Sequence, residues 1–135
     1  MDIREYFDSM KGCGILATAD ANGLVGAAMY ATPHVVDEET VAFIMLDRLT
    51  RHNLQSNPHA AYLFMEDGGG YRGKRFFLTK LQEEQDTDEI DEFCRRWYLS
   101  VKEKEEFLVY FRIDKVLPLI ETGEGLAALN DEQLN

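Results

Sequence analysis

The order of apolar and polar positions along the chain predicts a protein built mainly from β-strands. About six segments are rich in apolar, β-branched or aromatic residues; they cover residues 15–20, 24–36, 41–46, 60–65, 74–83 and 107–113. The segment 41–46 is continuously apolar, which indicates a strand buried on both faces. Asn22-Gly23 predicts a hairpin turn between the first two strands, because this pair tolerates positive φ. Pro33 cannot donate to a strand ladder, so a bulge or a sheet edge is expected there.

Helical periodicity is confined to three short stretches. Apolar residues at helical spacing predict helices over 2–11, Thr50–Ser56 and Asp86–Tyr98, and Asn57-Pro58 ends the second of them. Strands joined mainly by hairpins, with few helices, favour a mainly β (α+β) fold: a small, closed, six-stranded antiparallel barrel. The length of 135 residues fits one domain spanning 1–135.

The net charge of the chain limits the classes of partner that it is expected to bind. Asp and Glu number 25 against 14 Lys and Arg, and a net charge of −11 disfavours binding to nucleic acid or to an anionic membrane. No apolar run approaches the roughly 20 residues of a membrane span, and the charged N-terminus does not resemble a secretory signal. Cys13 and Cys94 form no metal motif, so we expect no metal site, a cytoplasmic protein and two buried, reduced thiols, although a disulfide stays possible.

Residues 47–54, Asp-Arg-Leu-Thr-Arg-His-Asn-Leu, form a basic turn in this acidic chain. A strand ends just before it, and Thr50 is a suitable N-cap for the helix that follows. Free N–H groups of the next three residues, Arg51, His52 and Asn53, together with the charge of Arg48, then suit an anion such as a cofactor phosphate. The alternative is that the arginines are solvated and pair with nearby carboxylates.

Small residues surround Met29 and Tyr30 on the second predicted strand, namely Gly26, Ala27, Ala28 and Ala31. They leave room for a flat ring against the backbone, although close packing within a barrel explains them equally. The segment from Gly68 to Lys74 imitates a phosphate-binding P-loop, but Arg75 stands where Ser or Thr must hold magnesium. No set of side chains is sufficient for catalysis, so catalytic residues stay unassigned and any chemistry is expected from a cofactor.

Four consecutive stretches carry a resemblance to a known family: GILATADANGLVGAAMY, VAFIMLDRLTRHNLQSNPHAAYLFM, GKRFFLTK and FRIDKVLPLIE. Their order over about residues 10–121 resembles the pyridoxamine 5′-phosphate oxidase-like family of FMN-binding split barrels. The most specific part is Asn53-Leu54 followed by Asn57-Pro58-His59-Ala60-Ala61. Many relatives carry a lysine near the position of Thr50, and this chain does not. The longer C-terminal substrate region of true pyridoxamine phosphate oxidases is also lacking, so vitamin B6 oxidation is not expected.

The resemblance implies a homodimer with FMN between its subunits. It puts the FMN phosphate at Arg48, Thr50, Arg51 and His52, and we expect Arg51 to contribute more to FMN binding than Arg48. It puts the ring against the strand of Met29 and Tyr30 and against the strand that ends at Met45 and Leu46. Three function classes follow: an FMN-dependent oxidoreductase or electron carrier using a small-molecule substrate or electron donor, a non-enzymatic barrel that binds haem or a deazaflavin, and a flavin-free stress-related dimer.

Overall fold

The computed structural model describes residues 1–85 and 106–121, and the predicted helix over 86–98 lies outside these ranges. Two helices and seven strands are present in the described part: α1 (Ile3–Ser9), β1 (Gly12–Ala19), β2 (Val25–Tyr30), β3 (His34–Val35), β4 (Thr40–Leu46), α2 (Leu49–Ser56), β5 (His59–Glu66), β6 (Gly73–Gln85) and β7 (Glu106–Pro118). The segment 24–36, predicted as one strand, is divided into β2 and β3. The break contains Pro33, which cannot donate to a ladder.

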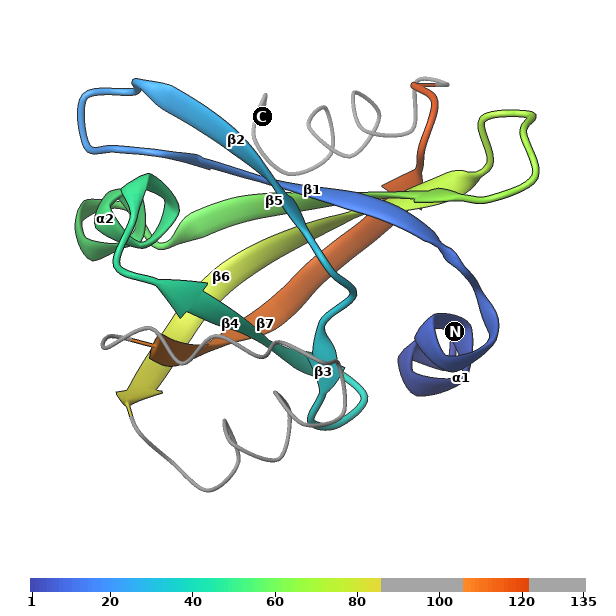
Figure 1. Ribbon diagram of the computed structural model, residues 1–135, viewed down its shortest axis with the longest axis horizontal. Helices are drawn as coiled ribbons and strands as arrows, with labels where there is room; N and C mark the ends of the chain where they lie inside the picture. Colours follow the sequence, from blue (N-terminus) through green and yellow to red (C-terminus); the bar gives the residue numbers. More distant parts are fainter. Residues whose placement is uncertain (86–105, 122–135) are drawn as a thin grey trace, which may run out of the picture.

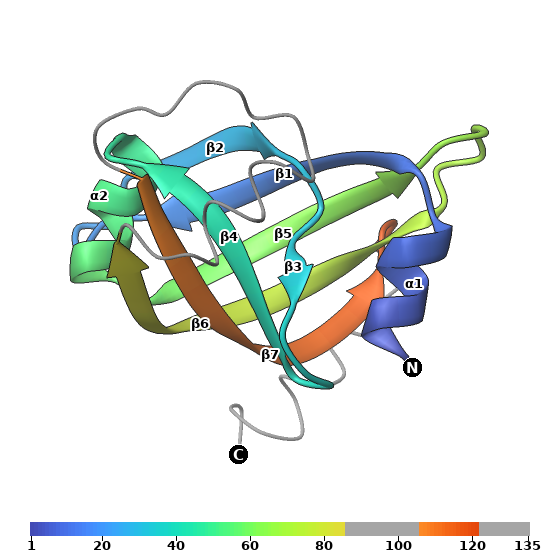
Figure 2. The same cartoon turned by 60° about the horizontal axis from the view of Figure 1, so that its bottom comes forward.

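All seven strands belong to one antiparallel sheet of order β2-β1-β5-β6-β7-β4-β3. The sheet curls around a common core, and α1 and α2 lie at opposite ends of it (Figures 1 and 2). The predicted antiparallel split barrel is confirmed, but the expectation of a closed barrel is wrong. In the described part of the chain β2 and β3 are the two edges of the sheet, and no pairing joins them. The barrel is therefore open between the edge strands β2 and β3.

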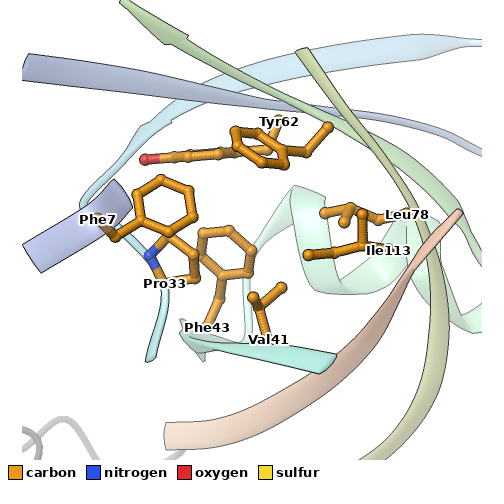
Figure 3. Close-up of a pocket in the computed structure, with 8 residues that line it drawn as sticks. Phe7, Pro33, Val41, Phe43, Tyr62, Leu78 and Ile113 are labelled. Carbon is orange, nitrogen blue, oxygen red and sulfur yellow. The ribbon is translucent and has the colours of Figure 1, made fainter. Parts of the chain in front are cut away.

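Aromatic side chains fill the interior. The largest fully buried residues are Tyr62, Phe64, Phe76 and Phe111, and Phe7 of α1 packs with its ring 5.2 Å from Phe76. Figure 3 shows how side chains from α1 and from the strands converge on one point of this core. The space between them is too small to admit a water molecule. Consequently this part of the core has no room for a ligand the size of a flavin or a haem.

The strand β4 is buried on both faces, as its continuous apolar run predicts. Val41, Phe43 and Met45 belong to the main core, whereas Ala42 packs with Leu108 in a second cluster on the opposite face. No helix in the described ranges is long and apolar enough to cross a membrane.

One close approach fixes the end of β2. A side chain at Gly14 would collide with the ring and hydroxyl of Tyr62. Because position 14 is glycine, the Tyr62 hydroxyl reaches across β1 and donates to the Tyr30 carbonyl oxygen at 3.1 Å. The last residue of β2 is thus tied to the core.

Candidate functional site

The start of α2 follows the end of β4 after one short turn. The Arg48 amide donates to the Leu46 carbonyl at 2.8 Å, so the chain reverses direction early and the helix begins at Leu49. Arg48, in extended conformation, is the N-cap residue, and its side chain makes no capping bond. The prediction that Thr50 caps the helix is therefore wrong. Thr50 lies inside the first turn and is only 8% exposed.

This shift changes which amides are free. The His52 amide donates to the Arg48 carbonyl at 3.0 Å, so His52 and Asn53 are already within the helical hydrogen-bond pattern. The first three helical residues, Leu49, Thr50 and Arg51, are the ones whose amides lack an intrahelical acceptor. The first turn contains no acidic residue. The helix start therefore keeps a positive end that can attract an anion.

Each pair of residues four apart on α2 has a different environment. Leu49 and Asn53 face β1 and β2, where the Asn53 amide donates to the Thr18 hydroxyl at 3.1 Å. Thr50 and Leu54 point into the core. Arg51 and Gln55 face β6 through Glu83, and Arg48 and His52 are exposed to solvent.

Arg51 is fully engaged within the protein. Its Nε and Nη2 donate to one oxygen of Glu83 at 3.2 and 2.5 Å, and its Nη1 donates to Asp47 at 3.0 Å. The guanidinium also stacks over the Phe107 ring, 3.5 Å from its centre. For Arg51 the structure therefore shows the alternative interpretation, in which an arginine of this turn pairs with nearby carboxylates. Its charge is compensated, and it fastens α2 to β6 and β7.

Glu83 is the centre of this ion-pair network. Besides Arg51, the Lys80 ammonium donates to it at 2.7 Å and the Gln55 amide at 3.2 Å. Burial alone would raise the pKa of Glu83, but the hydrogen bonds from Arg51, Lys80 and Gln55 outweigh it and lower the pKa to about 2. The carboxylate therefore stays ionised, and it holds α2 against the sheet at all ordinary pH values.

Arg48 and His52 differ from Arg51. Both side chains are exposed, and neither bonds to another residue within 1–85 or 106–121. They flank the free amides at the start of α2. The geometry thus reverses the order expected for the two arginines: Arg48, not Arg51, has donors free for an anion.

The predicted ring-binding residues do not share one face. Tyr30 points inward, with its ring 5.8 Å from Phe43. Burial raises the pKa of its hydroxyl, and a hydrogen bond with Thr50 opposes that rise. Met29 points to the opposite side of β2 and is 64% exposed. Met45 is wholly buried in the core, so its side chain cannot touch a ligand there, while Leu46 is half-buried at the end of β4.

The small residues of β2 lie at an edge of the sheet. Within the described ranges β2 pairs with β1 alone, so the backbone groups on its other side have no strand partner. A side chain at Gly26 would press against Leu49 of α2. Glycine at this position therefore lets the helix start approach the β2 edge. The start of α2, with its free amides, and the unpaired edge of β2 therefore lie close together.

Lys80 and Glu83 were missed by sequence reasoning. Residues three apart on a regular strand point to opposite faces, so their spacing predicts no contact. The irregularity between Lys80 and Gln82 changes this. It brings both side chains to the same side of β6, where Lys80 supplies a lysine near α2 that the basic turn itself lacks.

No protein-family model and no curated protein matches the sequence. Solved structures do match. An FMN-binding protein from Syntrophomonas wolfei superposes with a TM-score of 0.71 at 20% identity, covering 89% of this chain and 85% of the other. A pyridoxamine 5′-phosphate oxidase-like protein from Lactobacillus delbrueckii gives 0.61 at 18% identity, covering 84% and 88%. The chain has the fold of the pyridoxamine 5′-phosphate oxidase-like split barrels.

The haem-storage protein HutZ from Vibrio cholerae shares this split-barrel fold too, with a TM-score of 0.60, 19% identity and coverage of 86% and 91%. The predicted resemblance is thus confirmed for the fold. The identities are low, and the names of the first and the last of these proteins point to different groups, FMN for one and haem for the other. The choice of cofactor must therefore be argued from the site itself.

Proposed function

We propose that this split barrel binds FMN and works as a flavoprotein, an oxidoreductase or an electron carrier. The observation that carries the proposal is the start of α2, which has free amides, no acidic residue and an exposed Arg48 beside the open edge of β2. FMN has a terminal phosphate and a flat ring, and the two parts of the site suit these two groups.

The phosphate is the more demanding half of the ligand. It carries close to two negative charges, while the whole chain carries −11, so attraction has to be local. Free amides at a helix start provide it, and the helix dipole adds to it. Arg48 adds a guanidinium that can form two parallel hydrogen bonds with phosphate oxygens. His52, one turn along the same exposed face, is a further donor.

The ring needs a flat surface with hydrogen-bond donors and acceptors. The backbone edge of β2 offers both, and Gly26, Ala27 and Ala28 leave space beside it. When bound, FMN would accept and pass on hydride or electrons. The chain's own part is to hold the phosphate, to orient the ring along β2 and to tune it through backbone hydrogen bonds.

The filled interior supports a site shared by two copies. Since aromatic side chains fill the described part of the core, we place the ring outside it along β2, where this chain covers the ring on one side only. A buried ring then requires a second subunit, which is the reason for proposing a homodimer. Substrate or electron donor would be a small molecule. The thiol of Cys13 is free but exposed, so the expected burial is wrong for this cysteine. A free exposed thiol fits a reducing compartment, so we propose that the protein works in the cytoplasm, without nucleic-acid or membrane partners.

Haem is the second candidate, since a haem-storage protein has the same fold. Among the described residues His52 and His59 are exposed, and an imidazole nitrogen is a common ligand of haem iron. A Soret band in the purified protein favours haem. Flavin absorption near 450 nm, a general property of flavins, favours FMN. If neither band appears after reconstitution with both cofactors, the flavin-free dimer is the remaining alternative.

The deciding experiment is a titration of apo-protein with FMN, followed by quenching of flavin fluorescence. We expect Arg48→Ala to weaken binding about ten- to a hundredfold, the value of one charge-assisted contact of about 1.5–3 kcal/mol. Arg112→Ala, which removes another exposed arginine, on β7, is the matched control and should bind like the parent. Equal affinity of Arg48→Ala and the parent would refute the phosphate site. If the parent shows no saturable binding of FMN, the proposal that the protein is a flavoprotein is refuted.

A further inference from the structure

The first turn of α2 has no cap of its own. Arg48 occupies the N-cap position, and its side chain makes no capping bond. A helix start without a cap frays easily, because its first amides have no acceptor within the helix. The amides of Leu49, Thr50 and Arg51 are nevertheless the donors that we propose for the FMN phosphate. Their position therefore depends on contacts between this turn and the sheet.

Two contacts hold the turn, one on each side. On the side of β6, Arg51 pairs with Glu83. On the side of β2, a hydrogen bond joins the hydroxyls of Tyr30 and Thr50. Thr50 is only 8% exposed, so water competes little for this bond. A ligand that extends from the turn to the edge of β2 depends on the second contact, because that contact joins the two elements between which the ligand lies.

Tyr30 is itself held in place by the core. It is the last residue of β2, and the Tyr62 hydroxyl donates to its carbonyl oxygen at 3.1 Å. Its ring packs edge-on against Phe43, with 5.8 Å between the ring centres. The first contact restricts the backbone of Tyr30 and the second its ring, so the hydroxyl has little freedom. A continuous series of contacts thus runs from the buried aromatic residues through Tyr30 to the first turn of α2.

The helix approaches the same side of β2 at a second point. Gly26 and Tyr30 are four positions apart on the strand, so they share its inner side, whereas Met29 is on the outer side. A Cβ at Gly26 would lie 3.2 Å from Cδ2 of Leu49 and 3.5 Å from Nδ2 of Asn53. Figures 1 and 2 accordingly show α2 beside β2. The Tyr30 side chain is therefore on the side of β2 against which the helix lies.

We propose that Tyr30 is a positioning residue for the phosphate: its hydroxyl, through Thr50, fixes the free amides of α2 relative to the edge of β2. This role rests on the proposed FMN site and deepens it. It differs from the role that the resemblance implies, in which Tyr30 lies against the flavin ring. A site that is arranged before the ligand arrives loses less free energy in ordering itself, so the ligand binds more tightly.

Titrations of the full chain with FMN and with riboflavin test this role. Riboflavin has the same ring but no phosphate, so it reports the contacts of the ring alone. We expect Tyr30→Phe to bind FMN about two- to tenfold more weakly than the parent, the range of one neutral hydrogen bond, and to bind riboflavin with unchanged affinity. Tyr6→Phe is the matched control, because it removes the hydroxyl of a buried tyrosine in α1, at the other end of the sheet, where that hydroxyl donates to Glu66. It should bind both flavins like the parent.

Two substitutions of Thr50 test the hydrogen bond itself. Thr50→Val removes the hydroxyl with little change in shape and should weaken FMN binding as much as Tyr30→Phe does. The double variant should be no weaker than either single variant, because both substitutions remove the same bond. Thr50→Ser keeps a hydroxyl at this position and should retain most of the parent's affinity. These comparisons decide without any measurement of riboflavin.

Circular dichroism checks that each variant is folded, and if one substitution prevents folding, the variants at the other residue still decide. Equal losses of FMN and riboflavin affinity in Tyr30→Phe overturn the positioning role, because they place Tyr30 against the ring. Full FMN affinity in Tyr30→Phe, or additive losses in the double variant, overturn it too and leave the FMN site standing. A parent that binds no FMN overturns the proposed function and the positioning role with it.

Discussion

Replacing Arg51 with alanine is the sharpest test of how α2 is held. The substitution removes the charge-assisted bonds to Glu83, worth about 1.5–3 kcal/mol. It also removes the stacking on Phe107, worth about 0.5–2 kcal/mol at a partly buried position. The pair with Asp47, whose side chain is 48% exposed, adds only about 0.2–0.5 kcal/mol. Because these contributions overlap, we expect a loss of about 2–4 kcal/mol in the free energy of unfolding.

A loss of this size is easy to measure. For a chain of this length it lowers the melting temperature by roughly 8–15 °C. Thermal unfolding followed by circular dichroism is the assay, with Arg48→Ala as the control. Arg48 has no partner within the described ranges, so its removal should change the melting temperature by less than about 2 °C. The FMN titration should give the opposite order, with a larger loss of FMN affinity in Arg48→Ala than in Arg51→Ala.

Two results would refute the reasoning. If Arg51→Ala melts within about 2 °C of the parent, the network around Glu83 does not hold α2 in solution. If Arg51→Ala is stable but fails to bind FMN, Arg51 leaves Glu83 to reach the phosphate. In that case the ranking from the sequence, with Arg51 foremost, is right and the ranking from the geometry is wrong.

Three further perturbations test the fold around the site. The pKa of Glu83 falls from 4.5 to about 2, so its stabilising effect is complete above pH 4.5 and is lost as the pH drops towards 2. Allowing for solvent screening, the parent should lose about 1–2 kcal/mol more than Glu83→Gln in urea unfolding over this window, and equal losses would contradict the low pKa. Gly14→Ala should cost about 1–3 kcal/mol, because the Tyr62 ring has to move; an unchanged urea midpoint would show that it does not. Asn53→Ala should cost about 1–3 kcal/mol by leaving the buried Thr18 hydroxyl without its donor, and His52→Ala, on the exposed side of α2, is its comparison in the same assay.

The strands were predictable because their signal is local. Alternation of apolar residues identifies β1, β5 and β6, and the continuous run of β4 correctly predicts burial on both faces. The start of α2 was misplaced for an equally local reason. Thr50 has the chemistry of a cap, but the bond from the Arg48 amide to the Leu46 carbonyl turns the chain two residues earlier. Propensity for a cap was overridden by the geometry of the turn.

The site could not be predicted in full because its contacts are distant in sequence. Arg51 and Glu83 are 32 positions apart, and their encounter depends on how β6 bends. The chain's periodicity also does not say which side of β2 faces inward. The sequence groups Met29 with Tyr30, whereas the pleat separates them, and Met45 is on the core side of β4. A resemblance identifies the strands that line a site, but only coordinates assign each side chain to a face.

The filled interior has a consequence for how such a protein evolves. Folding stability comes from aromatic residues inside the barrel, while the proposed ligand contacts come from an edge strand and the first turn of a short helix. Substitutions at the edge and at exposed positions of the turn such as Arg48 cost little stability, so selection can alter what is bound without disturbing the core. The separation of the two residue sets makes cofactor identity an interchangeable trait of the fold. It offers a physical reason why one architecture serves an FMN-binding protein in one bacterium and a haem-storage protein in another.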